Sequence, residues 1–581
     1  MSASHEILKR YWGYDAFRPL QEDIIHSVLD GRDTLGLMPT GGGKSITFQV
    51  PALVMNGICI VVTPLIALMK DQVDTLKQKG IKATMVHSGM SHQEILTALE
   101  NCIYGDFKFL YVSPERLGTD LFIAKLKDMD VCLIAVDESH CISQWGYDFR
   151  PAYLQIAEIR ALLSEIPVLA LTATATSEVI DDIQDKLHFR KKNVFRKSFE
   201  RKNIAYVIRN TEDKLFEIRK ILNSVPGTGI VYVRSRKRTK EIAEELLRQG
   251  IDADFFHAGL TSDEKIRKQN EWKSGQRRII VCTNAFGMGI DKPDVRVVVH
   301  FELPNSLEEY FQEAGRAGRD EQKSYAVALF SAKDAGQLKK CIKDEFPESD
   351  FIKQVYEKLA YFYEIGMGMG ANKGHNFVIE QFCAAFHFNI THVHNALKLL
   401  NLAGYIEYIE ETDRHSKLMF TVQRDALYHI SLRPELDPLI QVVLRSYTGL
   451  FSDYIYISEA LLSQRTGLSP HAVYEGLKEL SAQHIIHYVP AKKVPVIYYP
   501  REREDIKYLN LPRSVYEDRL TRLQERVKNV IQYGTSTDTC RSKLLLQYFG
   551  EKDAGNCECC DVCLAKKQRE QKSRARFEAD V

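Results

Sequence analysis

The stretch MPTGGGKS, residues 38–45, decides the fold of the first part of this chain. Its three glycines have no side chains, so the loop can turn backbone N–H groups toward a triphosphate, while the lysine reaches the outer phosphates and the serine can hold Mg²⁺. Such a loop connects a strand to a helix, and the apolar run 33–38 and the helical spacing of 45–54 supply both. The expected nucleotide- and magnesium-binding residues are Thr40, Gly41, Gly42, Gly43, Lys44 and Ser45.

An acidic pair follows a second apolar run. Residues 131–136 are typical of a buried parallel strand, and Asp137 and Glu138 come directly after it. Ligands of open parallel sheets bind at the C-terminal ends of the strands, which is where these acids fall. Asp137 can hold Mg²⁺ through water, and Glu138 can polarise an attacking water. The pair therefore predicts hydrolysis of the nucleotide.

Length and composition indicate a protein of several soluble domains. The 581 residues predict about three to five domains. No apolar run is long enough to span a bilayer, and the first residues have no signal-peptide core, so we expect a cytoplasmic protein without a membrane partner, nucleoid-associated if bacterial. The net charge is +1, so any binding of nucleic acid must come from local patches.

Apolar strands alternate with helical patterns in two successive α/β units. This alternation predicts parallel sheets that are covered on both faces. The strands expected in the first unit are 59–63, 109–113, 131–136 and 168–172, and those expected in the second are 229–233, 253–256, 279–282 and 297–300. The second unit has no phosphate loop of its own, so we expect it to complete the site of the first.

Motifs in a fixed order make the segment from about residue 10 to 335 similar to superfamily 2 helicase cores, and specifically to the RecQ family of DNA helicases. Besides the phosphate loop, the matching stretches are FRPLQ (17–21), TPLIALMKDQV (63–73), YVSPERL (111–117), DESHCISQWGYDFRPAY (137–153), LTATAT (171–176), VCTNAFGMGIDKPDVR (281–296) and QEAGRAGRD (312–320). The resemblance implies that the nucleotide is ATP.

The resemblance also gives roles to individual residues. Arg18 and Gln21 resemble the family's adenine clamp, and Asp291 can face the ribose and Mg²⁺. Arg316 and Arg319 are three apart on a helix and share a face, and a guanidinium suits a transferring phosphate. By resemblance Arg319 is the arginine finger. The catalytic residues expected are Lys44, Asp137, Glu138, Arg316 and Arg319.

An aromatic segment follows the acidic strand. Exposed aromatics stack with single-stranded bases, and an arginine adds charge. In the family the equivalent loop is thought to couple DNA binding to hydrolysis, and the alternative is an aromatic cluster packed in the core. The expected DNA-binding residues of this segment are Trp145, Tyr147, Phe149 and Arg150.

Two winged-helix patterns follow residue 340. The first has helices at 377–388 and 393–402 and a two-stranded wing at 405–410 and 417–423; the second has helices at 457–465 and 470–482 and a hairpin at 485–489 and 494–499. Lys492 and Lys493 at the tip of the second hairpin are candidates for a wedge that contacts duplex DNA. An ordinary solvated lysine turn is the alternative.

A cluster of cysteines lies near the end of the chain. Cys540, Cys557, Cys560 and Cys563 have the spacing of a structural zinc site, next to expected helices at 515–533 and 541–549. Four thiolates leave no open position, and such sites supply about 10 to 16 kcal/mol to folding. By register with the family element, Cys559 is the spare thiol. A redox switch is the alternative.

The expected fold class is α/β, with two tandem RecA-like parallel-sheet lobes followed by winged-helix-like domains and a small helical zinc-binding domain. The expected domains are lobe 1 at 1–200, lobe 2 at 201–342, winged-helix-like domains at 343–430 and 431–508, the zinc-binding helical hairpin at 509–566, and a disordered charged tail at 567–581. The family usually has its zinc element directly after the motor, so the two winged-helix patterns before it are a departure.

The expected function is an ATP-dependent DNA helicase that moves 3′ to 5′ on single-stranded DNA and unwinds duplex DNA in repair or recombination, with single-strand-binding or repair proteins as partners. Its cofactors are then Mg²⁺ and Zn²⁺. A nucleotide-switched DNA-binding scaffold is the alternative, and an RNA helicase is a third option against which the RecQ-like zinc element argues.

Overall fold

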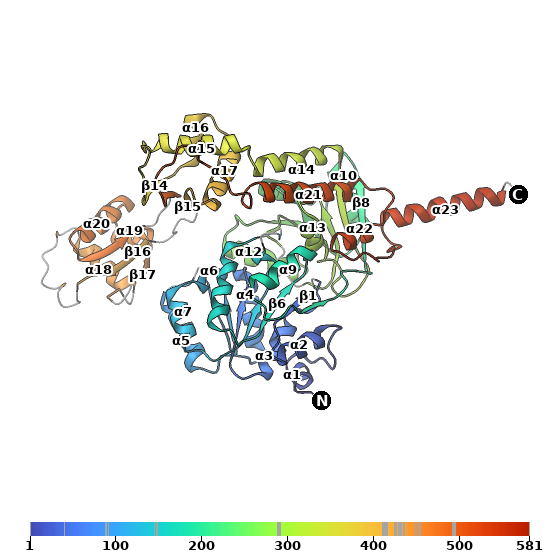
Figure 1. The fold of residues 1–581 in the computed structure, drawn as a ribbon, viewed down its shortest axis with the longest axis horizontal. Coiled ribbons are helices and arrows are strands. Elements are labelled where there is room, and N and C mark those ends of the chain that lie inside the picture. The colour runs from blue at the N-terminus through green and yellow to red at the C-terminus, as the bar shows by residue number, and fades with distance from the viewer. Residues whose placement is uncertain are drawn as a thin grey trace. The chain divides into compact units, whose positions relative to one another are not determined.

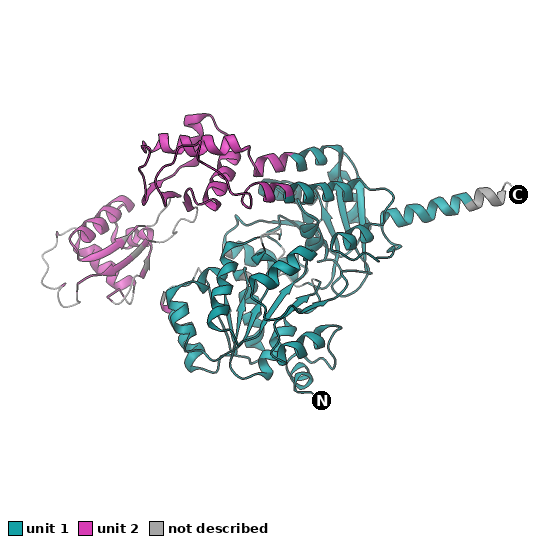
Figure 2. Ribbon diagram, viewed as in Figure 1, with its two compact units in different colours: residues 1–90, 94–339, 522–581 teal, residues 91–93, 340–521 magenta. Residues whose placement is uncertain are grey.

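A computed structural model (Figure 1) describes residues 2–579, except the following: 40, 88–89, 91, 144–145, 147–148, 287–291, 410–415, 423–426, 428–432, 434–435, 448–449, 452–454 and 491–494. The chain forms two compact units (Figure 2). Unit 1 comprises Met1–Met90, Glu94–Lys339 and Arg522–Val581, and unit 2 comprises Ser91–Gln93 and Lys340–Thr521.

The first half of unit 1, lobe 1, is built on a seven-stranded parallel sheet. Every residue of its central strands is buried, so helices must cover both faces. The strand order is β3 (Ala83–Val86), β4 (Phe109–Val112), β2 (Ile58–Val62), β5 (Val131–Val136), β6 (Val168–Thr172), β1 (Thr34–Leu37), β7 (Val194–Arg196). The helices are α1 (Ala3–Trp12), α2 (Gln21–Leu29), α3 (Ile46–Val54), α4 (Ile66–Gln78), α5 (His92–Tyr104), α6 (Pro114–Leu117), α7 (Asp120–Leu126), α8 (Gln155–Leu162) and α9 (Ser177–Lys186), with 3₁₀ turns η1 (Ser139–Ile142) and η2 (Pro151–Leu154).

Lobe 2 repeats this plan with six parallel strands. The order is β10 (Ala253–Phe256), β11 (Ile279–Cys282), β9 (Thr228–Tyr232), β12 (Val295–His300), β13 (Ser324–Phe330), β8 (Ile204–Asn210). Its helices are α10 (Lys214–Ser224), α11 (Arg236–Arg248), α12 (Ser262–Lys273), α13 (Leu307–Ala314) and α14 (Ala332–Glu345). The two sheets confirm the expected pair of parallel-sheet lobes.

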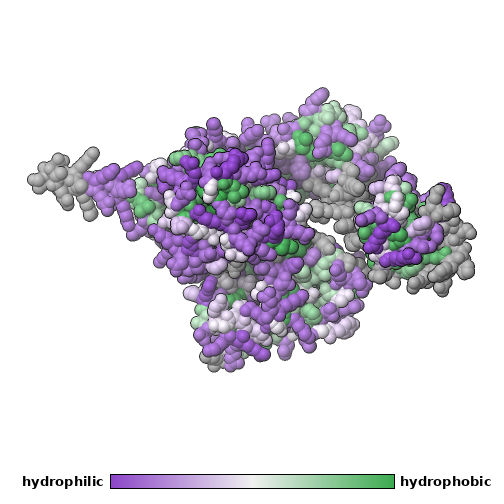
Figure 3. Space-filling model, turned by 180° about the vertical axis from the view of Figure 1, so that it is seen from behind, coloured by the Kyte–Doolittle hydropathy of each residue, from purple (hydrophilic) through white to green (hydrophobic). Residues whose placement is uncertain are grey.

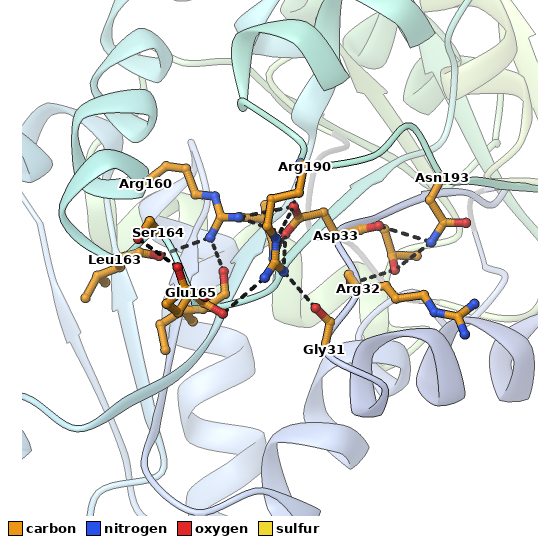
Figure 4. Close-up of polar contacts among 12 residues, drawn as sticks. Gly31, Arg32, Asp33, Arg160, Leu163, Ser164, Glu165, Arg190 and Asn193 are labelled. Carbon is orange, nitrogen blue, oxygen red and sulfur yellow. Dashed lines mark hydrogen bonds and ion pairs between the residues drawn. The ribbon is translucent and has the colours of Figure 1, made fainter.

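A buried carboxylate fastens the start of β1 in lobe 1 (Figure 4). The Asp33 side chain is 1% exposed and accepts hydrogen bonds from two arginines. Arg160 Nη2 lies 3.1 Å from one carboxylate oxygen, and Arg190 donates through its backbone N–H at 2.9 Å and through Nε at 3.0 Å. The backbone N–H of Val168, at the start of β6, donates at 3.0 Å. Asp33 therefore ties β6 and the segment before β7 to β1.

Unit 2 contains two three-stranded antiparallel sheets. Their orders are β14 (Lys373–Asn376), β19 (Val496–Tyr499), β15 (Glu407–Ile409), and β17 (Ile455–Ile457), β16 (Ser416–Phe420), β18 (Ile486–Val489). The helices are α15 (Ser349–Phe362), α16 (Ile379–Phe386), α17 (Ile390–Leu402), α18 (Asp437–Ser446), α19 (Glu459–Thr466) and α20 (Pro470–Ala482).

The two hairpins expected from the sequence in unit 2 are wrong. β15 pairs with β19 and β16 pairs with β18, so the strands on either side of each expected turn belong to different sheets. The cause is packing: Leu418 and Phe420 of β16 are buried with α18, α19 and α20, whereas Ile497 and Tyr499 of β19 are fully buried in the other sheet. Along the chain, β14 and β15 of the first sheet come first, the three strands of the second sheet follow, and β19 then completes the first sheet.

The C-terminal part of the chain is helical: α21 (Glu517–Thr535), which begins in unit 2 and continues into unit 1, α22 (Arg541–Tyr548) and α23 (Asp561–Ala579). The expectation of a disordered tail from residue 567 is corrected by α23, which runs to Ala579. On the face shown in Figure 3 the described part of this tail is hydrophilic. Among the described residues, none of the helices combines the length and the apolar character that a membrane crossing requires.

Candidate nucleotide site and metal site

The phosphate loop connects β1 to α3 as expected, and Ser45 directly precedes the helix. Gly41 and Gly43 have φ of 80° and 74°, which side chains rarely adopt. Arg18 Nη1 donates to the Gly41 carbonyl at 2.7 Å, and Gln21 Nε2 donates to the next two carbonyls at 3.2 and 3.1 Å. In this structure the two side chains brace the loop, and their expected contact with adenine stays a prediction.

The acidic pair lies beside the phosphate loop. β6 lies between β1 and β5, so the loop after β1 and the acids after β5 share one edge of the sheet. Lys44 Nζ lies 3.7 Å from Glu138 Oε1. His140 Nδ1 lies 3.4 Å from the other Glu138 oxygen and 2.9 Å from Thr172 Oγ1. Asp137 Oδ1 accepts from the Glu138 backbone N–H at 3.0 Å.

The two buried acids differ in their affinity for protons. Burial, and next the charge of Glu138, raise the pKa of Asp137 to about 6. Burial alone would also raise the pKa of Glu138, but Lys44, His140 and Arg316 lower it below its ordinary value. Glu138 is therefore the more acidic member of the pair, and a divalent cation beside Asp137 would favour the ionised form of Asp137.

Both arginines of the expected catalytic set approach this edge from lobe 2. A Cβ placed on Gly41 would lie 3.2 Å from Arg319 Cγ, so the Arg319 side chain lies directly against the phosphate loop. Arg316 is 5% exposed, and its charge contributes to the lowered pKa of Glu138. The structure therefore brings Lys44, Asp137, Glu138 and both arginines together.

The aromatic segment is described only in part. Tyr153 is fully buried, and its hydroxyl donates to the Asp137 carbonyl at 3.0 Å, so this aromatic packs in the core. Phe149 and Arg150 are half-buried, and Arg150 Nη1 donates to the Pro64 carbonyl at 3.4 Å. The expected site residues that lie outside the described part of the chain are Thr40, Trp145, Tyr147, Asp291, Lys492 and Lys493.

Sequence reasoning gave no role to His140, although it is the last letter of the DESH motif. The structure shows it buried between Glu138 and β6, where it orients the carboxylate. The spacing of His140 two residues after Glu138 was the sequence feature that could have indicated this role.

The four expected cysteines converge on one point. The Sγ atoms of Cys540, Cys557, Cys560 and Cys563 all lie within 4.8 Å of one another. Sulfurs about 2.3 Å from a tetrahedral zinc are separated by about 3.8 Å, and the measured separations from Cys540 are 3.4 Å to Cys557 and 3.9 Å to Cys560. The geometry fits a closed structural zinc site. Cys559 lies outside the group, with its sulfur 3.8 Å from the Ile204 carbonyl.

Family models match most of the chain in the order in which these features occur. They are the DEAD/DEAH box helicase at residues 18–183, the helicase conserved C-terminal domain at 213–321, the RecQ helicase winged-helix domain of Bacteroidota at 418–490, and RecQ zinc-binding at 504–564. The winged-helix match falls on the segment between β15 and β19 that forms the second sheet of unit 2.

Several curated relatives are RecQ-type helicases, in agreement with the family models. The chain is 45% identical over 334 residues to the ATP-dependent DNA helicase RecQ of Bacillus subtilis, covering 57% of this chain and 56% of that protein. It is 39% identical over 361 residues to RecQ of Haemophilus influenzae, covering 62% and 58%. It is 40% identical over 364 residues to the probable ATP-dependent DNA helicase RecS of Bacillus subtilis, covering 62% of this chain and 73% of that one. The match thus spans little more than half the length of the two RecQ proteins. With two parallel-sheet lobes, winged-helix and zinc-binding matches and a four-cysteine site, this chain belongs to the RecQ family of helicases.

Proposed function

We propose that this chain is an ATP-dependent DNA helicase that moves 3′ to 5′ along single-stranded DNA and separates duplex DNA, in repair or recombination. The observation that carries the proposal is the meeting of Lys44, Glu138 and Arg319 at one sheet edge, with the arginine supplied by the other lobe. A site shared by two lobes opens and closes with the nucleotide, and this movement can be converted into steps along a strand.

Each residue has a chemical task in ATP hydrolysis. Glu138 is anionic beside Lys44 and can accept hydrogen bonds from the attacking water, which orients it toward the γ-phosphate. Lys44 and Arg319 offset the negative charge that spreads over the phosphate oxygens in the transition state. Asp137 and Ser45 would hold Mg²⁺, which supplies further charge neutralisation when bound.

The proposed path of DNA is supported by the contact between the aromatic segment and the acids. Tyr153 bonds to the Asp137 carbonyl, so a strand that stacks near Phe149 and Arg150 can influence the hydrolysis site through few atoms. The alternative, a scaffold that only switches with nucleotide, gives no reason for an intact catalytic set. Single-stranded and duplex DNA are the proposed partners.

Strand separation of tailed duplexes tests the proposal. Matched DNA duplexes with a 3′ tail or a 5′ tail, and an RNA duplex with a 3′ tail, are incubated with the full chain and Mg²⁺, with and without ATP. We expect ATP-dependent separation of the 3′-tailed DNA alone. Preference for the 5′ tail or for RNA would contradict the assignment, and ATP turnover without any strand separation would favour the scaffold.

A further inference from the structure

The segment that joins the two lobes, residues 197–203, contacts two functional parts of unit 1. One is the arginine turn, residues 315–319, which carries Arg316 and Arg319. The other is the zinc module, residues 522–563. We propose that Arg201 is a positioning residue for the two arginines and that Glu551 of the zinc module holds the joining segment in place. The inference rests on the proposed function, because it concerns how the arginines that act in ATP hydrolysis are set.

Arg201 binds the backbone of the arginine turn at three points. Its Nη1 donates to the Gly315 carbonyl at 3.1 Å, and its Nη2 donates to the Ala317 and Gly318 carbonyls at 3.0 Å each. Two of these carbonyls flank Arg316, and the third belongs to the residue directly before Arg319. A planar guanidinium can bond several acceptors in a fixed geometry, which a lysine ammonium on a flexible stem cannot reproduce. Arg201 therefore fixes the direction in which the turn presents its side chains.

Asn203 adds a second contact from the same segment. Its Nδ2 donates to the Gly318 carbonyl at 2.7 Å and to the Gln322 carbonyl at 3.0 Å. Gly318 has φ of 55°, and a Cβ there would lie 2.5 Å from Asn203 Nδ2. The turn and the joining segment are thus packed so closely that glycine is required where they meet.

The other end of the joining segment is held by the zinc module. The carboxylate of Glu551 accepts from the Ser198 hydroxyl and from the Phe199 backbone N–H, each at 2.7 Å. The Phe199 ring is fully buried, with its centroid 5.1 Å from that of Phe549 and 5.9 Å from that of Phe311 on α13. Arg196, at the end of β7, donates to the Phe549 carbonyl.

These contacts connect the metal site to the catalytic edge through one short segment. Glu551 holds Ser198 and Phe199 by hydrogen bonds. Two residues after Phe199, Arg201 holds the arginine turn, whose Arg319 lies against the phosphate loop. A displacement of about 1 Å at a catalytic group can cost about 100-fold in rate. Loosening the segment should therefore lower kcat while leaving ATP binding intact.

The experiment compares Arg201→Lys with the unaltered full chain. We expect kcat for DNA-stimulated ATP hydrolysis to fall about 10- to 100-fold, with KM for ATP, zinc content and unfolding midpoint unchanged. Amide hydrogen exchange of residues 315–320, measured without nucleotide, should become faster. Glu551→Ala should produce a smaller loss of kcat in the same pattern, with faster exchange at 197–203. Lys202→Ala and Lys552→Ala are the neighbouring controls and should change nothing.

Two results with Arg201→Lys would overturn its positioning role, and one with Glu551→Ala would overturn the role of the zinc module. Arg201→Lys with unaltered kcat and unaltered exchange would remove the positioning role, and a joint fall in kcat, ATP affinity and unfolding midpoint would show general destabilisation. Should Arg201→Lys fail to fold, Asn203→Ser is judged by the same measurements. If Glu551→Ala leaves kcat and exchange at 197–203 unaltered, the zinc module has no part in it. Absence of turnover in the unaltered chain would refute the proposed function, while amide exchange still decides the role of Arg201.

Discussion

Replacement of Asp33 by asparagine tests how firmly lobe 1 depends on one buried charge. The substitution keeps the shape of the side chain but removes its charge and turns one acceptor oxygen into a donor. Arg190 is 42% exposed and can be rehydrated, whereas Arg160 is 3% exposed and would keep an uncompensated charge inside the lobe. Removal of one partner of a buried ion pair costs about 3 to 5 kcal/mol, so we expect lobe 1 to lose that amount.

Amide hydrogen exchange is the suitable assay, because a chain of several domains does not unfold in one step. A loss of about 3 to 5 kcal/mol should speed exchange in β1 and β6 by about 150- to 5,000-fold. The strands of lobe 2 serve as an internal reference and should keep their rates. Asp106→Asn is the matched control, since the Asp106 side chain is 99% exposed. Rates in β1 within about threefold of the unaltered chain would refute the reasoning.

The same site has a signature in pH. Burial alone would raise the pKa of Asp33, but hydrogen bonds from Arg190 and Val168 and the charge of Arg160 lower it below its ordinary value of 3.8. The stabilisation is therefore complete above that value and is lost as pH falls through the lower pKa of the folded state. The difference in stability between the unaltered chain and Asp33→Asn should be constant near neutral pH and should shrink only below about pH 4.

Three further predictions concern the site. Lys44→Ala and Glu138→Gln should each abolish DNA-stimulated ATP hydrolysis while DNA binding, measured by fluorescence anisotropy, survives; turnover in either would contradict the assigned chemistry. Cys557→Ser should lower the zinc content measured by mass spectrometry and destabilise α21 and α22, because a closed site needs all four thiolates, whereas Cys559→Ser should do neither. Gly318→Ala should cost about 1–2 kcal/mol for its left-handed φ, and the clash of the added Cβ should lower kcat as well; an unchanged kcat would argue against the tight turn.

Much of unit 1 could be predicted because its signals are local. β5 and β6 begin and end where their apolar runs do, since a strand buried on both faces must be apolar throughout. β7 was missed because it is an exposed edge strand of three residues, Val194–Arg196, without such a run. The convergence of Cys557, Cys560 and Cys563 could be predicted because two-residue intervals suit one metal ion, whereas the exclusion of Cys559 rested on the resemblance to the family element.

The strand pairings of unit 2 could not be predicted from the sequence because they depend on contacts between distant segments. A turn between two apolar runs predicts a hairpin only if the two runs face the same core, and the sequence does not say which core each strand joins. The role of Arg201 was missed for a related reason. Its partners are backbone carbonyls more than one hundred residues away, and because every residue has such a carbonyl, the sequence does not show which ones accept a hydrogen bond. The tail from residue 567 has the polar composition of a solvent-exposed segment, and this composition is found both in exposed helices and in disordered coil.

The pairing of β15 with β19 in unit 2 has a consequence for how the chain could be shortened. Ile409, the last residue of β15, is paired with Val496, the first of β19, so everything between them starts and finishes at neighbouring points on one sheet. A short reverse turn could bridge these two residues and leave the β14–β19–β15 sheet whole. Removal of the intervening segment is therefore expected to leave the pairing between β15 and β19 intact.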